Sequence, residues 1–243
     1  MSPATPPAQS RTVQAAFDSL NELAGALEQA WSSLRKQVPA GLDAADFLVQ
    51  LGLTYARLGL LHQVQDGHPA TAAAVIERYV RAWVQQMWRL DPASLIVRWQ
   101  RLGHGPTLLI SCIDFAVYSL LEAFTQRHRL RFVSCKPAVL SALELSPSAT
   151  GSGAAPRILV WTEPSAVAAR SPLVQLIHCA HAQPHALWRG WLPARDQATT
   201  SDEALQGAIR RFCAAYAPDT HVPLVLRHWD HSMPPQESSR ANP

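Results

Sequence analysis

Polar and potentially reactive residues gather at the end of one predicted strand. A continuous apolar run predicts a strand over residues 107–112, and Ser111, Cys112 and Asp114 lie at its carboxyl end. In open α/β sheets, ligands bind at the carboxyl ends of strands. A cysteine there is a candidate nucleophile, although a cysteine ending a buried strand is more often a small core residue. Asp114 can bind a ligand or cap the following helix, and capping is the commoner role.

Three more polar residues end the next predicted strands. Lys136 follows a strand over 130–135 and is one of only two lysines in the chain. Thr162 and Glu163 end a strand over 157–162. In a parallel sheet these ends share one edge with Ser111 and Asp114, so we expect all five residues to bind a ligand together. Glu163 is also consistent with a polar strand end that binds nothing.

Three histidines follow one another closely, at positions 178, 181 and 185. Their spacing suggests a zinc site, but His178 is predicted within a strand, and the side chain of Cys179 would point to the opposite face. We therefore expect no metal and no other cofactor. His181 has a side chain that can transfer protons near neutral pH.

The first hundred residues have apolar side chains at helical spacing. Helices are predicted at about 11–38, 43–61, 75–90 and 91–101. We expect a disordered leader over 1–10 and a helical bundle domain over 11–102.

The rest of the chain alternates between strand and helix patterns. Strands are predicted at 107–112, 130–135, 157–162, 173–179 and 222–226. Helices are predicted at 115–128, 137–145, from 165, and at 202–216, and the tryptophans 188 and 191 are assigned to a turn. The expected fold is α/β, with a helical N-terminal domain followed by a Rossmann-like, mostly parallel sheet with helices on both faces, over 103–230. A disordered tail is expected over 231–243.

Composition narrows the classes of function. The chain has 243 residues, 48% of them hydrophobic and 16% charged, and a net charge of +3 with scattered basic residues. We therefore expect no direct nucleic-acid binding. No apolar segment is long enough to cross a bilayer, and the four cysteines form no Cys-x-x-Cys pair, so a cytoplasmic protein with reduced thiols is expected.

Several motifs occur in an order typical of one family. The first reads Gly105-Pro106-Thr107-Leu108-Leu109-Ile110-Ser111, with Leu121-Glu122-Ala123 at the end of the next helix. The later ones are Ser134-Cys135-Lys136-Pro137, the strand 157–162 with its following small residues, and the segment 173–181. This order resembles the regulatory subunits of translation initiation factor 2B and their relatives, the methylthioribose-1-phosphate and ribose-1,5-bisphosphate isomerases.

The resemblance implies roles for individual residues. Cys112 falls on the isomerases' reactive cysteine, and Lys136 falls on an arginine that grips phosphate. The two acidic positions of the family are occupied by Ser134 and His181. Because isomerisation needs a proton acceptor and a proton donor, loss of both carboxylates favours a site without catalysis.

The function implied is that of a divergent initiation factor 2B-like protein, a non-catalytic regulatory or binding subunit. It would form a dimer with itself or another subunit and keep a vestigial cleft for a phosphorylated small molecule. One alternative is a sugar-phosphate isomerase that uses Cys112 and His181. Another is a receiver-like signalling module that cannot be phosphorylated, because the chain offers only Asp114 and Glu163 as acids and no lysine near Pro193.

Overall fold

The structure is a computed structural model of the chain. It describes residue 13 and residues 19–36, 46–62, 73–103, 106–144, 156–163, 172–180, 183–192, 201–217 and 224–228. The helices are α1 (Leu20–Arg35), α2 (Ala73–Trp88), α3 (Phe115–His128), α4 (Ala138–Glu144) and α5 (Ser201–Tyr216), with a 3-10 turn at Pro92–Ser94. The strands are β1 (Asp46–Leu51), β2 (Ala56–Leu61), β3 (Leu95–Arg101), β4 (Leu108–Asp114), β5 (Arg131–Pro137), β6 (Arg157–Glu163), β7 (Leu173–Ala180), β8 (Gln183–Trp191) and β9 (Leu224–His228).

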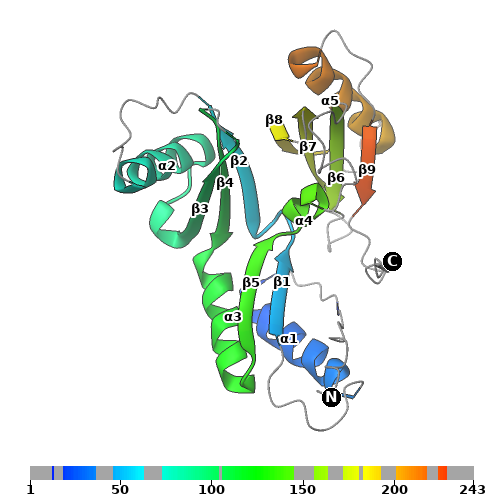
Figure 1. Cartoon of the computed structure of the whole chain (residues 1–243). Helices are drawn as coiled ribbons and strands as arrows, with labels where there is room; N and C mark the ends of the chain where they lie inside the picture. The colour runs from blue at the N-terminus through cyan, green and yellow to red at the C-terminus, as the bar shows by residue number, and fades with distance from the viewer. Residues whose placement is uncertain are drawn as a thin grey trace, which may run out of the picture.

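The described strands form three sheets (Figure 1). Sheet A is the parallel pair of β1 and β5. Sheet B has the order β2-β4-β3 and is antiparallel throughout. Sheet C has the order β8-β7-β6-β9, in which β9 alone runs parallel to its neighbour. The chain is therefore a mixed α/β protein, as expected.

The expected mostly parallel sheet is wrong for the described strands, because four of their six pairings are antiparallel. Strands that follow one another after a short connection pair antiparallel, whereas parallel pairing needs a long crossover. Only short segments join β3 to β4 and β7 to β8, so these strands pair antiparallel. The α5 helix supplies the crossover between β8 and β9.

The first hundred residues do not form the expected run of helices. The helix predicted over 43–61 is wrong, since β1 and β2 occupy it, and β3 replaces all but one turn of the fourth predicted helix. In β1, alternate residues turn toward the core, which is the two-residue period of a strand. The first predicted helix is confirmed from Leu20, where the Ser19 side chain accepts the N–H of Glu22 at 3.3 Å.

Most elements expected after residue 103 are confirmed. The α3 helix has the predicted bounds, and β4, β5, β6, β7, α4, α5 and β9 lie within a few residues of theirs. The turn predicted around Trp188 and Trp191 is wrong, because both residues lie in β8. Gly190 makes room for an indole within this strand: a Cβ there would stand 2.4 Å from Cη2 of Trp188. The helix predicted from 165 lies outside the described residues.

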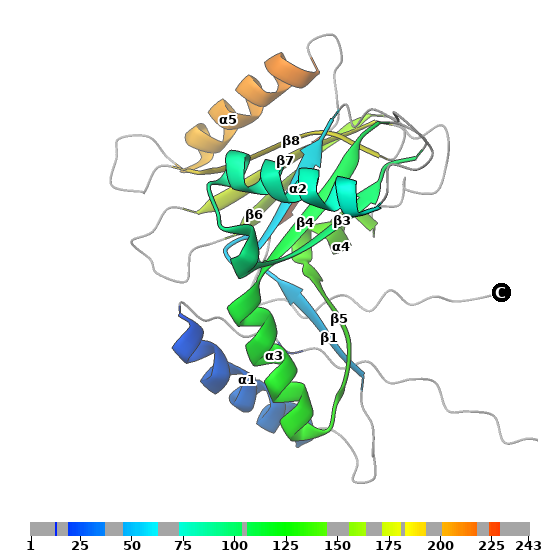
Figure 2. The ribbon, with the colours of Figure 1, turned by 90° about the vertical axis from the view of Figure 1, so that its left-hand side faces the viewer.

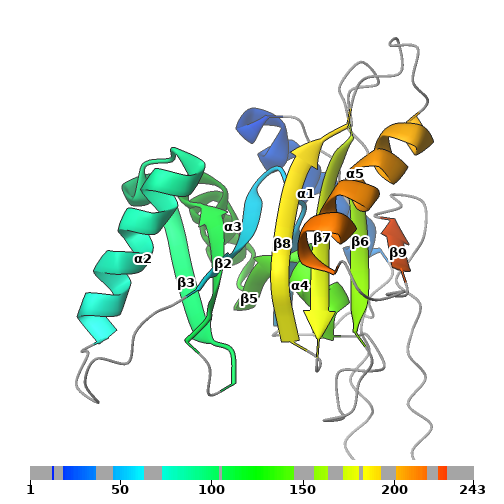
Figure 3. The same ribbon diagram turned by 90° about the horizontal axis from the view of Figure 1, so that it is seen from above.

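Each sheet is covered by helices on one face. The α2 helix packs on sheet B, α5 packs on sheet C, and α1 and α3 pack on sheet A (Figures 1 and 2). Sheets B and C pack against each other through buried side chains that include Leu58 of β2, Leu109 of β4 and Ile177 of β7. The β2 and β8 strands lie side by side where these sheets meet (Figure 3). No helix in the described part of the chain has the length and apolar character needed to cross a membrane.

Candidate functional site

Cys112 lies in the core between sheet B and α2. Its side chain is 1% exposed and packs in a cluster with Ile76 and Val80 of α2. Burial raises the pKa of the Cys112 thiol to about 12. The reactive form of a cysteine is the thiolate, so this environment favours an inert thiol.

Asp114 begins α3. Its carboxylate accepts the N–H groups of Ala116 at 2.8 Å and Val117 at 3.4 Å, which makes Asp114 the cap of this helix. Ser111 is half-buried on β4, with its side chain on the opposite face from Cys112.

The remaining predicted site residues lie in other sheets. Lys136 is on β5, where it pairs with Gln50 in sheet A, and the buried Thr162 is on β6 in sheet C. His181 is outside the described residues. Because β4, β5 and β6 belong to three different sheets, their ends do not meet at one shared edge.

Glu163 takes part in a polar contact between sheet C and the turn that joins β1 to β2. Its carboxylate accepts the N–H of Leu53, and the Leu53 carbonyl accepts a hydrogen bond from the Arg189 guanidinium of β8. Burial raises the pKa of Glu163, while the Leu53 hydrogen bond and the positive charge of Arg189 oppose that rise. A Cβ at Gly52 would stand 2.0 Å from the Glu163 carboxylate, so this close approach depends on glycine.

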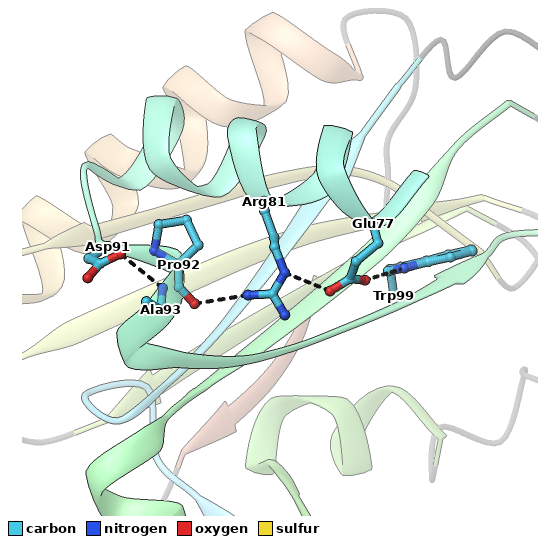
Figure 4. Close-up of polar contacts among 6 residues, drawn as sticks. All are labelled: Glu77, Arg81, Asp91, Pro92, Ala93 and Trp99. Carbon is cyan, nitrogen blue, oxygen red and sulfur yellow. Dashed lines mark hydrogen bonds and ion pairs between the residues drawn. The ribbon is translucent and has the colours of Figure 1, made fainter. Parts of the chain in front are cut away.

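Another set of polar contacts holds α2 on sheet B (Figure 4). Arg81 bonds to Glu77 at 2.8 Å and donates to the Pro92 carbonyl at 3.1 Å, and the indole N–H of Trp99 donates to Glu77 at 3.0 Å. Asp91 accepts the N–H of Ala93 at 2.9 Å. The charged groups of this cluster bind one another and the backbone, so its role is structural.

A shallow pocket of about 280 Å³ lies between β8 and α5. Its walls are two tryptophans, the leucine that follows β8, and one face of the helix: Trp188, Trp191, Leu192, Glu203, Ala204, Gly207, Ala208 and Arg211. Positions 204, 207, 208 and 211 recur at the spacing of one helix face, and their small members leave room beside the indoles. We call this feature the tryptophan groove.

The tryptophan groove has the features of a protein-binding surface. Trp191 is 58% exposed although its side chain is large and apolar. Exposed aromatic residues beside a pocket with a charged rim are typical of the residues that dominate binding energy in protein interfaces. Glu203 and Arg211 supply charges of both signs at this rim. In the sequence, this groove is signalled by tryptophans 188 and 191 and by the small residues of α5, and the groove forms because the two tryptophans lie in β8 beside that helix.

Comparison with known proteins gives no match by sequence: no family model matches the chain, and no curated protein does. By structure, the chain resembles one from a PilM-PilN type IV pilus biogenesis complex, with a TM-score of 0.52 and 12% identity over 93% of this chain and 72% of that chain. A second similar structure is the cytoplasmic domain of EpsL, an inner membrane component of the type II secretion system of Vibrio cholerae. Its TM-score is 0.47, with 12% identity over 84% of this chain and 67% of that chain. A third is a Bacteroides thetaiotaomicron protein described as having an actin-like ATPase fold and unknown function. Its TM-score is 0.39, with 12% identity over 70% of this chain and 55% of that chain.

This chain shares the fold of the pilus biogenesis protein. That finding overturns the resemblance to initiation factor 2B, and with it the translation-factor subunit, the sugar-phosphate isomerase and the receiver-like module. The most specific of the motifs that suggested the first two is β4 followed by α3. A buried strand, a capping aspartate and an amphipathic helix make a unit that many α/β folds need, so the match reflected local structure.

Proposed function

We propose that the chain is an assembly component that binds a partner protein within a multi-protein complex of the cell envelope, of the kind that builds pili or secretion systems. Support comes from the shared fold with a protein of the PilM-PilN complex. The observation that carries the proposal is Trp191, a tryptophan 58% exposed at the mouth of the tryptophan groove.

The chemistry of the groove fits a protein partner. Burying an exposed tryptophan removes a large apolar surface from water, and its indole N–H can still donate a hydrogen bond. Glu203 and Arg211 can orient a partner's charges at the rim without being buried.

A cross-linking experiment in the native organism tests this proposal. A photoactivatable phenylalanine derivative replaces Trp191, and a matched control replaces Tyr79, which is 53% exposed on α2 and remote from the tryptophan groove. We expect position 191 alone to give an adduct with a subunit of a pilus or secretion apparatus. Identical adducts from both positions, or none from position 191, would refute the proposal.

The captured pair then allows a quantitative measurement. We expect Trp191→Ala to weaken binding of the purified partner by about thirtyfold or more, the effect of losing a central aromatic anchor. Tyr79→Ala should leave the affinity unchanged.

A further inference from the structure

Two arginines lie on neighbouring strands where sheets B and C come together. Arg57 belongs to β2 and Arg189 to β8, the strands that lie side by side in Figure 3. Arg189 lies opposite Gln175 in the register of sheet C, and its guanidinium reaches across to the carbonyl of Leu53. We call this place the arginine seam.

Positive charge exceeds negative charge at the arginine seam. Among the described residues, Glu163 supplies the one carboxylate that acts on either guanidinium group, and its pKa is raised by burial. Burial, followed by the positive charge of Arg57, lowers the pKa of Arg189 to about 10, although the negative charge of Glu163 opposes the change. Like charges held together at a partly buried place are unfavourable unless something of opposite sign compensates them.

Hydrogen-bonding groups at the seam are also left unused. Nε of Arg189 is buried without an acceptor among the described residues. Arg57 lies 6.0 Å from the centre of the Trp88 ring, and the described part of the chain offers its guanidinium no oxygen acceptor. Buried polar groups are normally paired, so the buried Nε donor of Arg189 indicates a missing acceptor.

The arginine seam is held together by a hydrogen bond between strands, and solvent can reach it. Gln175 is 0% exposed, and its amide donates to the Leu58 carbonyl at 3.4 Å, which ties β7 to β2 beneath the arginines. The amide oxygen of Gln175 has no donor in the described residues and can accept a hydrogen bond from a protonated ligand or a water. Arg57 and Arg189 themselves are only half-buried.

We propose that Arg57 and Arg189 form a binding site for an oxyanion, a phosphate group or a carboxylate, at the seam between β2 and β8. An oxyanion supplies both the missing acceptors and the missing negative charge, and guanidinium groups match its geometry. This proposal does not depend on the tryptophan groove, whose residues lie on the α5 side of sheet C.

Calorimetric titration of the full chain with inorganic phosphate and, separately, with succinate tests the proposal at constant ionic strength. We expect one or both anions to bind, and Arg57→Gln to weaken binding about tenfold or more. Arg57→Gln is the main variant because Arg189 also bonds to the Leu53 backbone, and Arg189→Lys provides a second test. Arg210→Gln, on the exposed face of α5, is the matched control and should bind as the unchanged chain does.

Each outcome is decisive. Binding of phosphate alone identifies a phosphate ligand, and binding of succinate alone identifies a carboxylate, such as an acidic side chain of a partner. Binding of neither anion, or equal binding by the unchanged chain and Arg57→Gln, overturns the proposal. Trp191→Ala should bind the anion normally, so a failure here is distinguishable from a failure of the proposed function.

Discussion

The indole of Trp83 lies directly against Gly59, where a Cβ would stand 2.6 Å from Cη2 of the ring. Trp88 is equally close, and the two indoles pack edge to face with their centroids 5.2 Å apart. Because these rings join α2 to β2, Gly59→Ala forces the helix and the strand apart. We expect a loss of about 1–3 kcal/mol in the free energy of unfolding, measured by urea denaturation.

Gly25→Ala is the matched control for this substitution. Gly25 is exposed within α1, and a Cβ there has nothing within 4 Å. This change should stabilise the chain by about 0.5–1 kcal/mol, because alanine favours a helix over glycine. Equal effects of the two substitutions would show that the Trp83 contact does not constrain position 59.

Cys112 should be unreactive in the folded protein. Its thiol is 1% exposed and burial raises its pKa to about 12, so neither access nor ionisation favours alkylation. We expect iodoacetamide at about pH 8 to leave Cys112 unmodified until denaturant is added. Peptide mass spectrometry measures this, with the half-buried Cys213 as the internal comparison. Labelling of Cys112 as fast as Cys213 in the native protein would contradict the buried position.

The second half of the fold was predictable because its signals are local. Asp114 caps α3, and Val117, Leu121 and Phe124 recur on one face of that helix, so its bounds follow from neighbouring residues. The β6 and β7 strands are continuous apolar runs, as expected for strands buried on both faces.

The first half was not predictable in this way because its strands depend on distant partners. The apolar residues of 46–61 fit both a helical and an alternating period. The strand conformation is chosen because β1 pairs with β5 and β2 pairs with β4, and both partner strands lie far from this segment in the sequence. The arginine seam escapes sequence reasoning for the same reason, since β2 and β8 are far apart in the chain. The tryptophan groove lies between consecutive elements, and it escaped because Trp188 and Trp191 were assigned to a turn and not to β8.

Removing the cap of α3 should destabilise the chain. Asp114→Ala leaves the N–H groups of Ala116 and Val117 without their acceptor. We expect a loss of about 1 kcal/mol in the free energy of unfolding. Asp114→Asn should recover most of it, because asparagine caps equally well. If the alanine and asparagine variants were equally stable, the carboxylate would have no capping role.

Acid should weaken the contact between α1 and α3. Glu28 of α1 accepts hydrogen bonds from His128 at 3.1 Å and Arg127 at 3.0 Å at the end of α3. The hydrogen bond from His128, followed by that from Arg127, lowers the pKa of Glu28 below 4.5, although desolvation acts in the opposite direction. The folded chain therefore holds this proton less readily than the unfolded chain, so the contact stabilises the fold above about pH 4.5 and is lost as the pH falls below it.

The size of this effect is small because Glu28 is open to solvent, and we expect under about 0.5 kcal/mol. The effect is measured by denaturation at about pH 6 and at about pH 3.5, as the fall in the free energy of unfolding between these two pH values. Glu28→Gln should show a smaller fall than the unchanged chain, since glutamine does not titrate. Glu122→Gln, which changes an exposed carboxylate on α3, is the control and should keep the full dependence on pH. An identical fall in all three proteins would mean that Glu28 contributes nothing to acid sensitivity.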